Sequence, residues 1–214
     1  MELILVRHGN TFQSGDKAYW VGAGEDLPLV STGREQAILL STAFKKVRFL
    51  PQAIYSGPLK RTAEFAEIII NQLQLNTKTI IDHRLNEINY GQWAGLTSQA
   101  VCDQFGKTTL ENWEQYSKWP TQTTGGWGES EESVIQRIHA FSNDLIHRHA
   151  HHEIALAVTS NGCLRYFLKL ISGEFEKHIA MKNIKVATGH FCHLTHDGKT
   201  WHLKSWNQTP VQML

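Results

Sequence analysis

This sequence lacks a strong charge imbalance, paired cysteines and long apolar runs. Its 214 residues include 21 Lys and Arg against 20 Asp and Glu, a net charge of +1. This balance gives no sign of the broad basic surface that binds nucleic acid or an anionic membrane. No apolar stretch approaches the roughly 18 residues that a transmembrane helix needs. We therefore expect no nucleic-acid or membrane partner, and any positive potential should be local to a pocket.

Cysteine is scarce as well. Cys102, Cys163 and Cys192 are odd in number, widely spaced and form no Cys-x-x-Cys pair. Free buried thiols in a reducing compartment are the simplest interpretation. The first residues also lack the basic stretch and long apolar stretch of a signal peptide. We expect a cytoplasmic protein whose length fits a single domain, residues 1–214.

Short apolar stretches alternate with segments of helical periodicity, which predicts an α/β fold with a largely parallel sheet flanked by helices. Buried strands are predicted at residues 3–6, 53–56, 79–81 and 154–158. Helices are predicted at residues 31–46, 58–73, 129–149 and 162–171. Ser31 or Thr32 is a suitable N-cap for the first helix. A C-terminal hairpin is predicted at residues 188–206, turning at Asp197-Gly198.

The regular pattern loosens from Arg84 to Gly128, where most of the tryptophans fall. We expect an insertion at about residues 88–128, made of short helices and loops, that caps the pocket. Its Thr- and Gly-rich end, residues 121–128, suggests a mobile loop. A folded cap or a pocket rim explains the tryptophans better than a carbohydrate-stacking surface does.

The first apolar strand ends abruptly in Arg7-His8-Gly9. In open α/β sheets, ligands bind at the carboxyl ends of the strands. An arginine binds phosphate in a bidentate manner, and a neutral histidine can form a covalent intermediate. Gly9 permits a tight turn and a close backbone approach to a ligand. For an isolated Arg-His-Gly, a histidine that only caps the strand is an equally good interpretation.

Here the motif is one of six, in an order that resembles the histidine phosphatase superfamily, also called phosphoglycerate mutase-like. They are Arg7-His8-Gly9, Leu29 with Gly33-Arg34-Glu35-Gln36-Ala37, Ser56–Thr62, Leu85–Leu96, Gly128-Glu129-Ser130 and Val158–Arg165. The resemblance covers nearly the whole chain. It implies a metal-independent, cofactor-free phosphomonoesterase that forms a phosphohistidine on His8 and acts on a small phosphorylated substrate. Phosphoglycerate mutase-like activity is a variant of the same chemistry.

The resemblance assigns the binding residues and the nucleophile. His8 must be neutral to attack, and neighbouring arginines would lower its pKa. A backbone carbonyl should hold its other ring nitrogen and fix the tautomer. Arg7 and Arg61 are the expected phosphate clamps, with hydroxyl hydrogen bonds from Thr11 and Ser14.

Glu87 is the expected acid for the leaving oxygen. It must be protonated to act, and partial burial against Tyr90 and Trp93 would raise its pKa. A surface glutamate ahead of a turn is the structural alternative. The match to the family's acidic motif favours the interpretation of Glu87 as the proton donor.

The second histidine of the family is missing from its expected position. The family carries Ser-His-Gly-Gly after the fourth apolar strand, and the residues here are Thr159-Ser160-Asn161-Gly162. Ser160 keeps a neutral O–H donor and Asn161 adds an amide, so both are candidate phosphate ligands. Losing one preorganised donor can lower kcat by a factor on the order of 10²–10³. An alternative function follows: a catalytically impaired member that binds a phosphorylated ligand in a regulatory role.

Other histidines offer weaker signals. His190 is a conceivable substitute for the missing histidine, but its alternating surroundings favour an ordinary strand position. A cluster at residues 147–152 contains His147, His149, His151 and His152. No carboxylate or cysteine pattern completes a metal site there, and cations at a helix C-terminus explain the cluster better. We therefore expect no bound metal.

Overall fold

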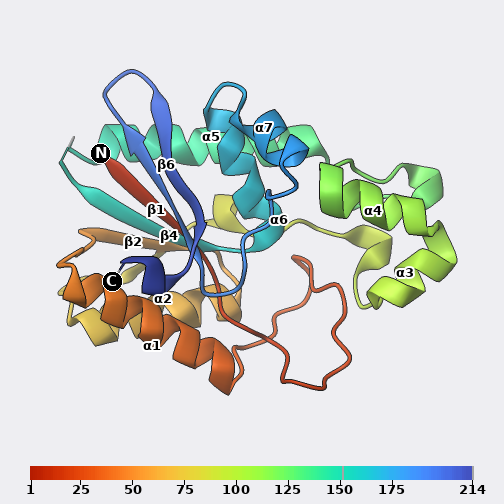
Figure 1. Cartoon of the computed structure of the whole chain (residues 1–214), viewed down its shortest axis with the longest axis horizontal. Coiled ribbons are helices and arrows are strands. Elements are labelled where there is room, and N and C mark those ends of the chain that lie inside the picture. Colours follow the sequence, from red (N-terminus) through yellow and green to blue (C-terminus); the bar gives the residue numbers. More distant parts are fainter. Residues whose placement is uncertain (151, 214) are drawn as a thin grey trace.

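One six-stranded sheet forms the centre of the molecule in the computed structural model, which describes residues 1–150 and 152–213 (Figure 1). The strand order is β3-β2-β4-β1-β5-β6. The strands are β1 (Glu2–Arg7), β2 (Ala53–Ser56), β3 (Thr79–Ile81), β4 (Ile154–Thr159), β5 (Phe191–His196) and β6 (Trp201–Gln208). The first four pair in parallel, whereas β5 runs antiparallel to β1 and β6 antiparallel to β5. The predicted largely parallel α/β sheet is confirmed.

Alternate residues of β1 face two separate hydrophobic cores. Leu3 and Leu5 join the core that contains residues of α5 (Glu131–Arg148). Ile4 and Val6 join the core formed with α1 (Ser31–Lys46) and α2 (Lys60–Leu73). A strand with helices on both sides is apolar throughout because neither face meets water. The continuous apolar run at the start of the chain therefore has a direct structural cause.

The predicted helices form, with differences in their bounds; α2 begins at Lys60 rather than at residue 58, and α5 spans Glu131–Arg148 rather than residues 129–149. Val30 is the N-cap of α1 and makes no side-chain capping bond, so capping by Ser31 or Thr32 is wrong. The N–H of Val30 instead donates to the carbonyl of Asn10 at 3.0 Å, which already directs the chain into the helix. The helix predicted after Gly162 divides into α6 (Asn161–Leu164) and η4 (Arg165–Leu170), and the sequence reasoning missed α7 (Glu174–Ala180). The C-terminal hairpin is confirmed, and the short η5 (Pro210–Met213) follows it.

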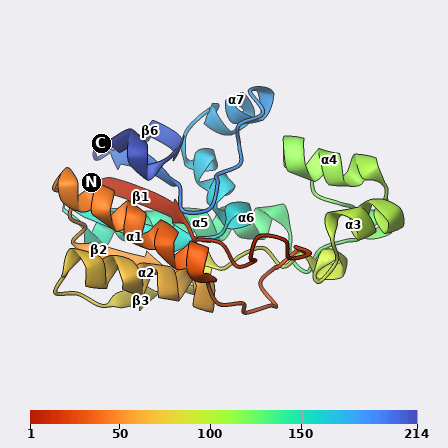
Figure 2. The same cartoon turned by 60° about the horizontal axis from the view of Figure 1, so that its bottom comes forward.

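Between β3 and α5 the chain forms only short helices, and α3 and α4 lie beyond the end of the sheet (Figure 2). These helices are η1 (His83–Leu85), η2 (Gly91–Trp93), α3 (Ser98–Phe105), α4 (Lys107–Tyr116) and η3 (Gln122–Thr124). Trp93, Trp113 and Trp127 are buried there, and the rings of Trp113 and Trp127 meet edge to face with centroids 4.5 Å apart. Edge-to-face aromatic packing joins this small region to the hydrophobic core that also contains Leu3 and Leu5.

The weaker sequence signals resolve into ordinary structural roles. All three cysteines are free, as predicted, although Cys102 is only partly buried. His149 at the end of α5 forms hydrogen bonds with Tyr55 (2.9 Å) and Glu153 (2.8 Å). His151 lies outside the described residues. Within residues 1–150 and 152–213 no helix is both long enough and apolar enough to cross a bilayer.

Candidate active site

A cavity of about 470 Å³ opens where β1 and β4 end. Its walls come from the end of β1, the following loop, α2, the Glu87 loop, α4 and the start of α6. In an open α/β sheet this is the edge where ligands bind. The residues that line it are Arg7, His8, Asn10, Thr11, Phe12, Ala18, Tyr19, Trp20, Val21, Arg61, Glu87, Tyr90, Ser98, Trp113, Glu114, Asn161, Arg165, Lys185 and Thr188.

His8 is buried at the base of this cavity and is only 7% exposed. Its Nδ1 lies 2.7 Å from the carbonyl oxygen of Gly9. A carbonyl only accepts, so Nδ1 carries the proton and Nε2 keeps the lone pair. Burial, with the charges of Arg61 and Arg7, holds the pKa of His8 well below its usual range. The imidazole is therefore neutral, with its nucleophilic nitrogen defined by a single hydrogen bond.

The loop after His8 packs tightly against the start of α1. A Cβ on Gly9 would collide with the backbone of Gly33, at 2.6 Å from its Cα. The close approach that Gly9 permits is therefore to α1, a partner that the sequence does not reveal. Gln36 of the same helix accepts a hydrogen bond from the N–H of Asn10 at 2.9 Å. The Gly33–Ala37 motif thus supports the loop that follows His8.

Arg7 and Arg61 both reach the cavity and are held by backbone carbonyls. Arg7 donates through Nη1 to Val186 at 2.7 Å, and its Nε is buried without a hydrogen-bond partner in the described residues. Arg61 donates to Glu25 at 2.8 Å and to Gly22 at 3.2 Å. Burial lowers the pKa of both guanidiniums because each has lost water. An anion in the cavity would restore the lost solvation.

A third guanidinium, that of Arg165, was missed as a site residue. It is 1% exposed and donates to Ser117 at 2.9 Å, with its Cζ 4.0 Å from the ring centroid of Trp113. Its Nε is buried without a partner in the described part of the chain. Lys185 also lines the cavity but is paired with Glu114 at 3.1 Å. The family motif marked the position of Arg165, but only the fold shows that α4 holds its side chain at the cavity.

Glu87 is 6% exposed and is surrounded by N–H donors rather than by aromatic rings alone. Its Oε1 accepts from Ile88 at 2.8 Å and from Cys163 at 3.1 Å, and its Oε2 accepts from Gly162 at 3.3 Å. A Cβ on Gly162 would lie 2.5 Å from Oε1 and 2.5 Å from the hydroxyl oxygen of Tyr90. Glycine at this position is what lets the carboxylate reach the start of α6.

The structure brings most of the predicted ligands to the cavity but not all of them. Thr11 and Asn161 line it, and Asn161 Oδ1 accepts from Val186 at 2.9 Å. Ser160 lies next to them, 1% exposed, and its hydroxyl has no hydrogen-bond partner within the described residues. Ser160 is not one of the lining residues, and neither is Ser14, which is exposed on the loop. The ring of His190 lies outside the cavity and contacts Asn207 Oδ1 at 2.9 Å.

Comparison with known proteins identifies the family. Residues 3–209 match the model of the histidine phosphatase superfamily, branch 1. The chain belongs to the histidine phosphatase superfamily. This finding confirms the resemblance seen in the six motifs, and it supports a phosphatase or mutase enzyme.

The individual relatives are distant and differ in activity. Phosphoserine phosphatase 1 of Hydrogenobacter thermophilus is 29% identical over 154 residues, which cover 70% of this chain and 66% of that protein, so the chain spans about two thirds of its length. A 2,3-bisphosphoglycerate-dependent phosphoglycerate mutase of Corynebacterium glutamicum is 23% identical over 220 residues, covering 92% of this chain and 87% of that protein. A mycobacterial glucosyl-3-phosphoglycerate phosphatase, solved with VO3, superposes with a TM-score of 0.78 at 21% identity over 96% and 98% of the two chains. That structural likeness shows the shared fold.

Proposed function

We propose that this chain hydrolyses small phosphomonoesters through a phosphohistidine on His8. The observation that carries the proposal is the buried neutral imidazole, held through Nδ1 by Gly9, in a cavity with three guanidiniums. Phosphoryl transfer needs an in-line nucleophile and positive charge around the equatorial oxygens. Arg7, Arg61 and Arg165 provide that charge. The names of the relatives concern small phosphorylated compounds, which supports the same class of substrate here.

In the first step, Nε2 of His8 attacks phosphorus. A P–N bond forms while the P–O ester bond breaks, and the leaving oxygen takes a proton from Glu87. Within the described residues, the Oε2 atom of Glu87 accepts one long hydrogen bond, at 3.3 Å, and is the oxygen with room for that proton. Thr11 and Asn161 line the cavity, and in this proposal they donate hydrogen bonds to the phosphoryl oxygens. Glu87 then takes a proton from water, which attacks phosphorus and releases inorganic phosphate from His8.

The direct test is hydrolysis of p-nitrophenyl phosphate between mildly acidic and neutral pH. We expect His8→Ala to abolish turnover and a chelator to leave it unchanged. His190→Ala is the matched control, because it removes a histidine outside the cavity. Activity that survives in His8→Ala, or that a chelator removes, would contradict the proposed mechanism. Interconversion of 2- and 3-phosphoglycerate by the same preparation would assign mutase activity to the phosphohistidine.

A second candidate function is phosphate-ester binding without efficient turnover, in a regulatory role. The observation that favours it is the buried Ser160 hydroxyl, which has no hydrogen-bond partner in the described part of the chain at the position proposed for the second histidine. Calorimetry with phosphate esters would then show binding that depends on Arg7 and Arg61. Ser160→His separates the two functions, because only a weakened enzyme gains rate when the cation is restored.

A further inference from the structure

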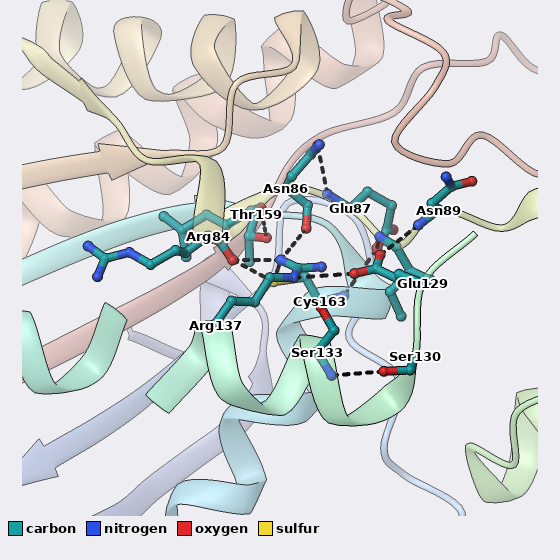
Figure 3. Close-up of polar contacts among 12 residues, drawn as sticks. Arg84, Asn86, Glu87, Asn89, Glu129, Ser130, Ser133, Arg137, Thr159 and Cys163 are labelled. Atoms are coloured by element: carbon teal, nitrogen blue, oxygen red, sulfur yellow. Dashed lines mark hydrogen bonds and ion pairs between the residues drawn. The ribbon is translucent and has the colours of Figure 1, made fainter. Parts of the chain in front are cut away.

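The loop that carries Glu87 is held by side chains that include Arg137 of α5, as Figure 3 shows. Arg137 donates through Nη1 to the carbonyl of Arg84 at 2.5 Å and to the carbonyl of Asn86 at 2.7 Å. Between those two residues, the carbonyl of Leu85 accepts from the hydroxyl of Thr159 at 2.7 Å. Three consecutive carbonyls before Glu87 are therefore bound to side chains from α5 and β4. Few backbone conformations satisfy all of them at once.

The segment after Glu87 is tied to the same arginine. Glu129 accepts through Oε1 from the N–H of Asn89 at 2.8 Å. Its Oε2 lies 3.6 Å from Nε of Arg137, and the two side chains are only 19% and 15% exposed. Ser130, next in the chain, accepts from the N–H of Ser133 and caps α5. The Gly128-Glu129-Ser130 motif thus fixes the start of α5 and connects it to the Glu87 loop.

Arg137 also contacts α6, the helix whose N–H groups bind the Glu87 carboxylate. Its Nη1 lies 3.5 Å from Sγ of Cys163, whose N–H donates to Glu87 Oε1 at 3.1 Å. The arginine itself does not touch the cavity, since it is not among the lining residues. Arg137 therefore contacts the backbone before Glu87. It also contacts Glu129, which binds the backbone after Glu87, and Cys163, which binds the Glu87 carboxylate.

We propose that Arg137 is a positioning residue that holds Glu87 at the leaving oxygen of the substrate. This inference rests on the proposed function, in which Glu87 is the acid. Arg137 acts through hydrogen bonds to the backbone, so it affects only steps in which Glu87 takes part. Binding of the phosphate group by Arg7 and Arg61 is independent of it.

The test compares two esters with leaving groups of different basicity. Glycerol 2-phosphate has an alkoxide leaving group that needs a proton, whereas p-nitrophenolate leaves without one. We expect Glu87→Gln to lower kcat for glycerol 2-phosphate by about 10²–10⁴-fold and to affect p-nitrophenyl phosphate much less. Arg137→Met should show the same selective loss, of about 10-fold or more, with Arg137→Lys partly restoring the rate. When Glu87→Gln is already present, Arg137→Met should have no further effect on kcat for glycerol 2-phosphate.

Arg148→Met is the matched control, since Arg148 lies on the same helix, is 62% exposed and has its guanidinium 3.9 Å from Asp144. Equal loss for both esters in Arg137→Met and Arg137→Lys, or an additive loss in the double variant, would overturn the positioning role. If Arg137→Met does not fold, Arg137→Lys and Glu129→Gln carry the comparison. An unaltered rate in Glu87→Gln overturns the acid assignment, and with it the positioning role, while leaving His8 untouched. A wild-type chain that hydrolyses neither ester refutes both proposals.

Discussion

The contact between α1 and the loop that follows His8 allows a test in which helix propensity and packing have opposite effects on the free energy of unfolding. Gly33 lies in the first turn of α1, where alanine is intrinsically favoured over glycine by up to about 1 kcal/mol. A Cβ at Gly33, however, would lie 2.9 Å from the backbone nitrogen of Asn10 and still closer to its carbonyl oxygen. Both atoms belong to the backbone and cannot rotate away. Gly33→Ala therefore forces α1 and the loop apart.

The packing effect should be the larger one. Overpacking of a closely fitted core costs about 1–3 kcal/mol, and here it also strains the Gln36 hydrogen bond to Asn10. A clash with backbone atoms belongs in the upper part of that range, about 2–3 kcal/mol. After subtraction of a propensity gain of about 1 kcal/mol, we expect Gly33→Ala to lower the free energy of unfolding by about 1–2 kcal/mol. For a chain of this length, that corresponds to a fall in Tm of about 2–8 °C. Asn10 is two residues from His8, so kcat for p-nitrophenyl phosphate should fall in the same variant.

Thermal unfolding and steady-state hydrolysis measure the two effects. Gly24→Ala is the control, because among the described residues no atom beyond its chain neighbours lies within 4 Å of the Cβ it would introduce, and Gly24 has no unusual φ. We expect Gly24→Ala to leave both Tm and kcat nearly unchanged. A Gly33→Ala variant with a raised Tm and unchanged kcat would mean that the loop tolerates the Cβ. The argument that this glycine supports His8 would then be refuted.

Three further substitutions test other parts of the structure. Gly162→Ala should lower the free energy of unfolding by about 1–3 kcal/mol in denaturant titrations, because its Cβ would meet Oε1 of the buried Glu87. Burial opposes it, but hydrogen bonds from Arg84 hold the pKa of Asp82 below its usual range. The stability that Asp82 contributes is therefore present above pH ~4 and lost as the pH falls. Asp82→Asn should make the free energy of unfolding depend less on pH in the acid range. Tyr55→Phe removes the 2.9 Å hydrogen bond to His149. It should lower the free energy of unfolding by about 0.5–1.5 kcal/mol, measured by thermal unfolding, and leave turnover intact.

The parts of the fold that the sequence predicts are those with local causes. The run Leu3–Val6 is apolar because both of its faces are covered, and that requirement is visible without knowing what covers it. The helix at residues 131–148 shows its buried face through spacing alone. By contrast, α7 has only seven residues, too few for a clear period. The N-cap of α1 depends on a hydrogen bond from Val30 to Asn10, so its position is set by a distant turn.

The site divides in the same way. His8 is predicted as a site residue from its place at the end of an apolar strand together with the five other motifs, and its hydrogen bond to Gly9 is local. The hydrogen-bond partners of Glu87 cannot be recognised in this way, because the N–H groups of Gly162 and Cys163 lie 75 and 76 residues away in the chain. The role of Arg165 likewise depends on α4, which folds from a distant segment. Such contacts depend on tertiary packing, which spacing does not encode.

The three guanidiniums also bear on what Ser160 changes. Arg7, Arg61 and Arg165 line the cavity, and their combined positive charge exceeds the negative charge of a phosphate monoester dianion. Net charge for binding is therefore sufficient without a second histidine. If Ser160 replaces the second histidine, as proposed, the site lacks a strong donor at one position where charge develops in the transition state. We therefore expect Ser160→His to raise kcat for p-nitrophenyl phosphate while its KM changes little, and a fall in KM at constant kcat would show that affinity was the missing component.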